Sequence, residues 1–351
     1  MPKTLMAAIL AALVLAAAGV AMAQPKSAAL SPLGDFVLGP VSGRIDYQSL
    51  DPASGRLYVS MMGAGKLLVF DTRQNKVLAQ LDGFPKTTGV LAVPPMHRVY
   101  ASVPGAGLGS SLGVGLGMLG LSSGHGAVAV IDSDTTKQIA RLPGGVFPDG
   151  IAYDAKDNRI FVSDEMGSAV TVIDAAADRA IARVAAGGEV GNVQYDAATA
   201  RLYAPIQSKN ELAVFDPEKN VRIANYPLPG CDHPHGLAIA PDAAVGFAAC
   251  DGNDVLVTVD LRTGSILGHL PLGHDPDVLA MDPGYKRLYV ASESGRLSRF
   301  DITNPRIPAA LGESFIGPGA HSVAVDPASH RLYFPLADAG GHAVMRVLVP
   351  G

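Results

Sequence analysis

Short apolar segments separated by turn residues recur along most of the chain, and residues 277–301 show the unit most clearly. Apolar residues dominate the positions 278–281 and 288–291, and Asp282-Pro283-Gly284 lies between them. Proline presets φ and glycine accepts a positive φ, so this triplet predicts a tight turn between two strands. A sheet of three or four such strands cannot bury both of its faces alone. The pattern therefore predicts a protein in which small sheets stack on copies of themselves.

Two series of residues set the period of the repeat. An aromatic residue marks the second strand of each unit, at intervals of 42, 61, 42, 44, 42 and 44 residues, and an aspartate ends the third strand at intervals of 61, 42, 42, 44 and 41. The aromatics are Tyr58, Tyr100, Phe161, Tyr203, Phe247, Tyr289 and Tyr333, and the aspartates are Asp71, Asp132, Asp174, Asp216, Asp260 and Asp301. A period of about 40–45 residues with three or four strands per unit is typical of a β-propeller. We therefore expect an all-β fold, a seven-bladed β-propeller of four-stranded blades, as a single domain over residues 24–351.

The seventh repeat ends just after its third strand, at residues 342–349. The segment Asp35-Phe36-Val37-Leu38-Gly39 precedes the first complete unit and has no sheet of its own. An unpaired sheet edge is a site of aggregation, and pairing this segment with the last repeat removes it. We expect the N-terminal strand to close the ring by pairing with the C-terminal blade.

The strand sequences resemble those of the YVTN-repeat family of bacterial seven-bladed propellers. The resemblance rests on segments such as 57–60 (LYVS), 160–163 (IFVS) and 288–291 (LYVA), each followed by a glycine-containing turn and a third strand. It covers essentially all of residues 24–351 and implies the fold and an exported or surface location. It implies no particular activity, and no repeat has the Thr-Asn that follows Tyr-Val in the family name.

The first 23 residues have the pattern of a signal peptide. Lys3 precedes an apolar run over residues 5–20, and Ala21-Met22-Ala23 is an A-x-A cleavage signal. A retained membrane anchor is the alternative, but the run is short for a span. We expect cleavage after Ala23, a periplasmic or secreted protein, and no membrane span after cleavage.

Composition and motifs exclude several classes of function. The formal net charge is −5 and the lysines and arginines are dispersed, which counts against nucleic acid as a partner. There is no C-x-x-C, P-loop, serine nucleophile elbow or His-Glu-x-x-His, so we expect no haem and no nucleotide. Cys231 and Cys250 are the only cysteines. Both fall on the same end of the fifth blade, and in an exported protein such a pair normally bonds, so we expect a disulfide.

One repeat carries an insertion. Residues 104–123 lie between the second and third strands of blade 2 and are uncharged and rich in glycine. Such a segment is either a flexible loop or an apolar flap over a binding site.

Candidate chemistry lies where the innermost strands begin, because these positions converge around one mouth of the central channel. Aligned on the turn before each aromatic, the positions are Asp46, Gly89, Asp149, Gly191, His235, Asp277 and His321. Blades 5, 6, 7 and 1 are neighbours once the ring closes, so two histidines and two aspartates form one arc. These four side chains, His235, Asp277, His321 and Asp46, predict a divalent-metal site. Asp149 lies across the mouth and His233 and His274 lie in loops behind it, and we assign these three to ligand binding.

The alternative is that these residues only stabilise turns, as aspartate and histidine often do. A structural role should recur in every blade, and Gly89 and Gly191 break the series. A second series, an arginine before six of the seven aromatics, has a structural explanation. An aspartate stands five residues before five of these arginines, which predicts local Arg–Asp pairing across each turn.

Two functions follow from the site, and the sequence favours the first. One is a non-catalytic binding or scaffold protein that recognises a small ligand, metal ion or protein partner at the channel mouth. The other is a metal-dependent lactonase- or lyase-like enzyme, in which the arc holds a cation that polarises a carbonyl. A DNA-binding or cell-envelope interaction propeller is a third and weaker possibility.

Overall fold

The structure is a computed structural model, and it describes residues 29–41, 43–105 and 126–351. The predicted signal peptide lies outside the described residues, as does the predicted insertion from residue 106 onward. Among the described residues, no helix is both long enough and apolar enough to cross a membrane.

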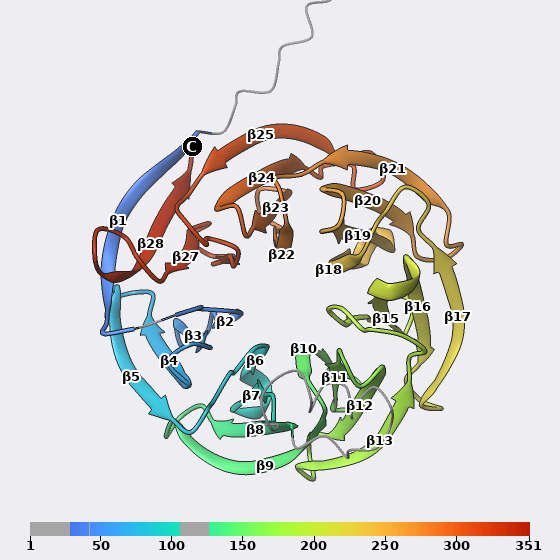
Figure 1. Ribbon diagram of the computed structural model, residues 1–351, viewed down its shortest axis with the longest axis horizontal. Coiled ribbons are helices and arrows are strands. Elements are labelled where there is room, and N and C mark those ends of the chain that lie inside the picture. Colours follow the sequence, from blue (N-terminus) through green and yellow to red (C-terminus); the bar gives the residue numbers. More distant parts are fainter. Residues whose placement is uncertain (1–28, 42, 106–125) are drawn as a thin grey trace, which may run out of the picture.

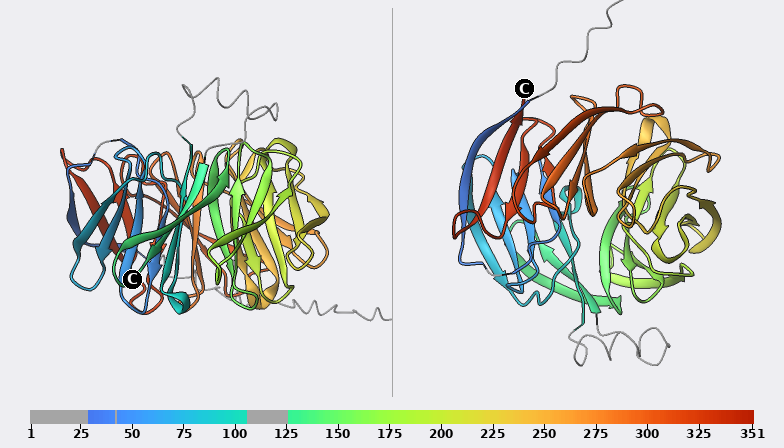
Figure 2. Two further views of the ribbon diagram at one scale, coloured as in Figure 1. Left: turned by 90° about the horizontal axis from the view of Figure 1, so that it is seen from below. Right: turned by 45° about the horizontal axis from the view of Figure 1, so that its top comes forward.

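The strands of the described chain form seven four-stranded antiparallel sheets arranged radially around a central axis (Figure 1). Seen from the side, the sheets stand next to one another around a disc (Figure 2). Blade 1 contains β2 (Gln48–Asp51), β3 (Arg56–Met61), β4 (Lys66–Asp71) and β5 (Lys76–Asp82). Blade 2 contains β6 (Val90–Val93), β7 (Arg98–Val103), β8 (Gly126–Asp132) and β9 (Lys137–Gly145). Blade 3 contains β10 (Pro148–Asp154), β11 (Arg159–Asp164), β12 (Ala169–Asp174) and β13 (Arg179–Ala185). Blades 4 and 5 contain β14 (Gln194–Asp196), β15 (Arg201–Ile206), β16 (Glu211–Asp216) and β17 (Val221–Pro227); and β18 (Pro234–Ala240), β19 (Val245–Cys250), β20 (Val255–Asp260) and β21 (Ile266–Pro271). Blades 6 and 7 contain β22 (Pro276–Asp282), β23 (Arg287–Ser292), β24 (Arg296–Asp301) and β25 (Ala309–Phe315); and β26 (Ala324–Val325), β27 (Leu332–Leu336), β28 (Ala343–Pro350) and β1 (Leu30–Gly39). The all-β, seven-bladed prediction is confirmed.

The hydrophobic core lies between blades. Each of the seven buried clusters combines side chains from two adjacent sheets, as when Phe161 and Val172 of blade 3 cluster with Leu202 of blade 4. The seven aromatics that set the period in the sequence are all 2% exposed or less. The repeat is therefore a packing repeat, in which each second strand supplies one large ring to a blade interface.

Ring closure by the N-terminal strand is confirmed. β1 pairs antiparallel with β28 and forms the outer edge of blade 7 (Figure 1). Asp35 of β1 accepts two hydrogen bonds from the guanidinium of Arg346 on β28, at 2.8 and 2.6 Å. On the other side, Gln80 of blade 1 donates a hydrogen bond to the Leu38 carbonyl oxygen. The N-terminal strand therefore links the last blade to the first, at what we call the closure seam.

The predicted Arg–Asp pairing across the turns is wrong in its partners. The aspartate before each turn accepts hydrogen bonds from backbone amides of its own turn, as Asp51 does from the amide of Ala53. In three blades the arginine instead lies near the aspartate that ends the third strand, as Arg287 does with Asp301 at 2.7 Å. In two other blades the arginine, Arg56 or Arg159, donates to a backbone carbonyl of the neighbouring blade. The first residue of the second strand and the last residue of the third lie side by side in the hairpin, whereas the turn aspartate accepts hydrogen bonds from its own turn.

The disulfide prediction is confirmed: Cys231 and Cys250 are bonded, with their Cα atoms 5.5 Å apart. Both residues are buried, and the bond closes a loop within blade 5. It joins the segment that enters β18 to the end of β19. That segment leads directly to His235 at the channel mouth.

Candidate functional site

The residues predicted to begin the innermost strands do lie at or near the starts of those strands. His235 and Asp277 are the second residues of β18 and β22, whereas Asp46 and His321 precede β2 and β26 by two and three positions. The sheets converge on the axis, so these starts form one mouth of the channel (Figure 1). In blade 2, the end of β7 and the start of β8 lie on the face of the propeller that carries this mouth, because antiparallel pairing places Val103 opposite Ala127.

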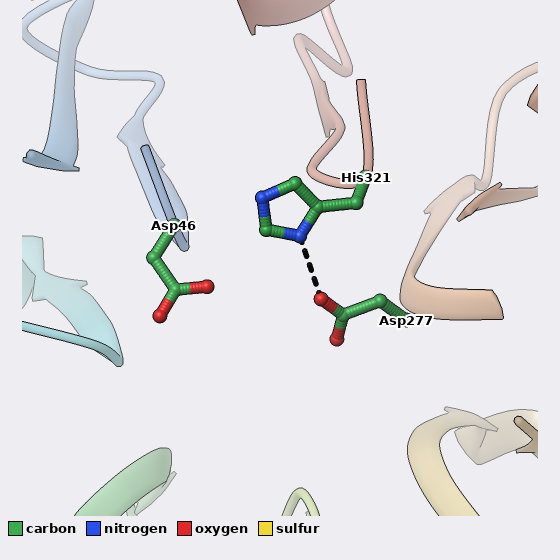
Figure 3. A group of neighbouring side chains, drawn as sticks. All are labelled: Asp46, Asp277 and His321. Carbon is green, nitrogen blue, oxygen red and sulfur yellow. Dashed lines mark hydrogen bonds and ion pairs between the residues drawn. The ribbon is translucent and has the colours of Figure 1, made fainter. Parts of the chain in front are cut away.

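Asp46, Asp277 and His321 come from blades 1, 6 and 7 and face one another across the closure seam (Figure 3). One donor atom from each residue lies within 4.8 Å of the other two, and all three residues are buried. His321 Nδ1 donates a hydrogen bond to Asp277 Oδ2 at 2.7 Å. Its Nε2 donates to the backbone carbonyl of Ile45 at 2.7 Å, which fixes the orientation of the ring. We call these three residues the mouth triad.

A guanidinium group lies within the mouth triad. Arg44 Nη2 is 3.1 Å from His321 Nδ1, 3.3 Å from Asp277 Oδ2 and 3.4 Å from Asp46 Oδ1. The other terminal nitrogen, Nη1, contacts Glu293. Both nitrogens of the His321 ring already donate hydrogen bonds, so the approach of Arg44 to Nδ1 is a contact between two donors, and both cations share the Asp277 carboxylate.

Tyr47 extends across the channel and connects blade 1 to the opposite side. Its hydroxyl donates to Asp277 Oδ1 at 3.2 Å and accepts from Asn192 of blade 4 at 2.6 Å. It also lies 3.1 Å from His235 Nε2, whose ring donates through Nδ1 to Gln207 at 3.0 Å. A continuous chain of polar groups therefore links blades 4, 5, 6 and 1 across the mouth.

The electrostatics of the mouth follow from burial and these short contacts. Burial opposes ionisation of Asp277, but His321 and His235 outweigh it and hold its pKa at about 2. Burial opposes protonation of the two histidines, but the neighbouring carboxylates, Asp277 above all, raise the pKa of each to about 9. Burial raises the pKa of Asp46 to about 6, although Arg44 acts in the opposite direction. The mouth is thus a set of compensating charges held out of water.

The three residues assigned to ligand binding are placed differently from one another. Asp149 is buried, with Oδ2 3.9 Å from His235 Nε2, and burial together with Glu165 raises its pKa well above the usual range. His233 pairs with Asp251 at 2.7 Å, and the largely exposed His274 pairs with Asp254 at 3.0 Å. The structure brings Asp149 to the central cluster and gives the two histidines partners of their own, so their role in ligand binding stays a prediction.

The two glycines that interrupt the arc have a steric explanation. A Cβ on Gly89 would lie 2.0 Å from the carbonyl oxygen of Asp149, and one on Gly191 would lie 2.5 Å from that of His235. The innermost strands of blades 2 and 4 approach their neighbours too closely at these points for any side chain. The series of side chains is therefore interrupted at these two positions because a side chain has no room there.

Below the mouth the channel contains a cavity of about 290 Å³. Its walls are the innermost strands of all seven blades, and apolar side chains such as Leu91, Ile151 and Met281 line it. Tyr47 and Asn192 belong both to this lining and to the polar chain above it. The polar mouth thus lies at one end of a channel whose wall combines apolar side chains with polar groups.

Arg44, Tyr47 and Asn192 were not among the residues predicted from the sequence. Tyr47 and Asn192 each directly follow a predicted strand-start residue, so their positions were available from the alignment of repeats. Their reach across the axis was not, because it depends on how blades 1 and 4 face each other. Arg44 lies in the segment that joins β1 to β2, outside the repeat pattern.

Comparisons with known proteins bear on the fold. No family model and no curated protein sequence matches the chain, so membership of the YVTN-repeat family stays an expectation. Among solved structures, the chain is similar to Kuenenia stuttgartiensis hydrazine synthase, with a TM-score of 0.69, 16% identity, and coverage of 85% of this chain and 93% of that one. It is also similar to a chain in the crystal structure of the mitotic checkpoint complex, with a TM-score of 0.73, 11% identity and full coverage of both. At these identities the likeness shows the propeller fold alone.

Proposed function

We propose that the protein is an exported binding propeller that holds a divalent cation at the channel mouth, on Asp46, Asp277 and His321. The observation that carries the proposal is the convergence of three buried donor groups from three different blades. Two carboxylates and one imidazole are a donor set typical of divalent transition metals. An exported location agrees with the Cys231–Cys250 disulfide, since such bonds persist in oxidising compartments.

The surroundings of the triad support a cation ligand. His321 Nε2 donates to a backbone carbonyl, the arrangement that normally orients a metal-ligating histidine. The other ring nitrogen, Nδ1, would bind the metal in exchange for the proton that it now donates to Asp277. The guanidinium of Arg44 lies among the same three donors, so the pocket already accommodates a positive charge. Glu293 adds a further carboxylate at its edge.

Titration of untagged, chelator-treated protein with Mn²⁺, Zn²⁺, Ca²⁺ and Mg²⁺ in a calorimeter tests the proposal. We expect one bound ion per chain for at least one of these metals, and at least a tenfold loss of affinity in His321→Ala. The matched control is His330→Ala, because His330 also pairs with an aspartate, Asp282, in a turn away from the mouth. Wild-type protein that binds none of the four ions, or a His321→Ala variant with unchanged affinity, would overturn the proposal.

A metal-dependent lactonase- or lyase-like enzyme is the second function that a specific observation favours. Proton-transfer groups lie beside the triad: the Tyr47 hydroxyl and His235 Nε2 are 3.2 and 3.5 Å from Asp277 Oδ1. In such an enzyme the cation would polarise a carbonyl and His235 would move a proton. Metal-loaded wild type and His235→Gln are assayed against a panel of lactones. Turnover that His235→Gln abolishes while it still binds metal indicates the enzyme, and no turnover by either protein favours the binding function.

A further inference from the structure

Arg44 and a metal ion cannot occupy the mouth triad together. A divalent ion sits about 2.0–2.6 Å from its ligand atoms. Arg44 Nη2 lies 3.1–3.4 Å from one donor atom of each triad residue, so it fills the space between them. Binding of an ion at these atoms therefore requires the guanidinium to leave.

The Arg44 side chain is partly accessible to solvent. The Arg44 side chain is 41% exposed, although its three partners in the triad are buried. Its backbone is held separately, because the Arg44 carbonyl accepts a hydrogen bond from the amide of Gly63 at 2.8 Å. Rotation of the side chain toward solvent would vacate the triad without breaking this backbone hydrogen bond.

Glu293 provides a partner for the displaced side chain. It contacts Arg44 Nη1 through the oxygen Oε1, which lies at the edge of the triad, 3.3 Å from His321 Nδ1, and its own side chain is 30% exposed. Arg44 can turn about this contact and keep one ion pair after it leaves the other carboxylates. The displaced state therefore retains part of the electrostatic stabilisation of the closed one.

We propose that Arg44 is a displaceable internal cation that competes with the bound metal for the mouth triad and so sets the affinity and the charge selectivity of the site. This inference rests on the proposed cation site. A preorganised guanidinium already supplies one positive charge, so monovalent ions gain little by replacing it. A divalent ion brings a second charge to Asp46 and Asp277, and this favours the exchange.

Calorimetry on chelator-treated Arg44→Gln, with Arg296→Gln as the matched control, tests the competition. Arg296 lies at the start of β24 on the same face, is 51% exposed, and pairs only loosely with Glu313 at 3.6 Å. We expect Arg44→Gln to bind Mn²⁺ or Zn²⁺ at least tenfold more tightly than wild type, and Arg296→Gln to match wild type. Arg44→Lys keeps the positive charge but loses the two terminal nitrogens of the guanidinium, so its metal affinity should lie between those of wild type and Arg44→Gln.

The outcomes separate the two proposals. If wild type binds the ion and Arg44→Gln binds it equally or less tightly, Arg44 is no competitor, and the cation site itself stands. If neither protein binds, the cation site falls. If only Arg44→Gln binds, the competition stands, and wild type does not hold a cation by itself.

Nitrogen-15 NMR of the arginine side chains in wild-type protein gives a readout that needs no variant, in case Arg44→Gln fails to fold. Saturating metal should shift the guanidinium resonances of Arg44, which leaves the buried carboxylates, and leave those of Arg287 on the opposite face unchanged. Unshifted Arg44 resonances when the metal is bound would overturn the displacement.

Discussion

The closure seam offers the sharpest test of the fold, because two adjacent residues of β1 face opposite ways. Leu38 is 0% exposed and belongs to the cluster that joins Leu57 of blade 1 to Met345 of blade 7. Val37 is 62% exposed. Truncation of each side chain to alanine on the same strand therefore compares a seam contact with a solvent contact.

The expected magnitudes differ several-fold. Leu38→Ala removes a fully buried side chain and leaves a cavity, which costs about 2.7–5 kcal/mol in well-packed cores. Val37→Ala is a surface change and should stay within about 0.5 kcal/mol. A typical domain has a total free energy of unfolding of about 5–15 kcal/mol, so the loss at Leu38 is a large fraction of it.

Urea denaturation followed by circular dichroism measures both variants against wild type. We expect a clear fall in the midpoint for Leu38→Ala, with the slope unchanged if the ring still unfolds as one unit. Equal midpoints for Leu38→Ala and Val37→Ala would refute the packing of β1 at the seam. A Leu38→Ala variant that loses stability in blade 7 alone, seen as a second transition, would show that the seam does not couple the ring.

Three further predictions address other parts of the molecule. Replacing Cys231 and Cys250 together by alanine opens a loop with a sequence separation of 19, which should cost about 3 kcal/mol in urea denaturation; an unchanged midpoint would contradict the entropic argument. Gly89→Ala should destabilise the protein by more than about 2 kcal/mol, because its Cβ would meet a backbone oxygen at 2.0 Å. The control, Gly268→Ala, has open space around the added Cβ and should lower the melting temperature little. Similar melting temperatures for the two variants would refute the steric explanation. The hydrogen bonds that Asp35 accepts from its arginine partner on β28 lower its pKa, so its contribution is complete above the unfolded pKa of about 3.9 and is lost as the pH falls below it. The half-exposed pair is worth at most about 1 kcal/mol, and Asp35→Asn should flatten the acid limb of the melting temperature against pH; an identical acid limb in both proteins would contradict this.

The fold could be predicted from the sequence because it depends on a period. Aromatic residues such as Tyr58 and Phe247 recur where each blade buries a ring against its neighbour. The spacing of these residues in the sequence is therefore the number of residues in one blade. The closing strand was predictable for a related reason: an unpaired segment and an incomplete repeat stand at opposite ends of the chain. The partners of the repeated arginines were not, because a turn aspartate can equally well bind its own amides.

Only some residues of the candidate site could be predicted from the sequence. Alignment of repeats placed Asp46, Asp277 and His321 at one mouth, since equivalent positions in a propeller lie at equivalent heights. It contained no information on Arg44, because the segment joining β1 to β2 lies outside the repeat, and it located Tyr47 without showing that its side chain reaches across the axis. Which side chain fills the space between converging groups depends on reach across the axis, and a periodic pattern does not encode that reach.

The position of the mouth triad relative to the closure seam links binding to stability. Asp46 belongs to blade 1, His321 to blade 7 and Asp277 to blade 6, so any cation among them, whether Arg44 or a metal, bridges the first blade to the last two. Blade 7 is the blade in which the chain is not continuous, because its third and fourth strands, β28 and β1, come from opposite ends of the sequence. A cation that binds only the folded ring stabilises it by mass action, in proportion to the logarithm of its concentration above Kd. Exchange of Arg44 for a divalent ion would then replace an ion-pair bridge across the seam by a coordinate one. The ring would thus be held on its outside by β1 and at its mouth by the cation, and occupancy of the mouth would tune the strength of the closure.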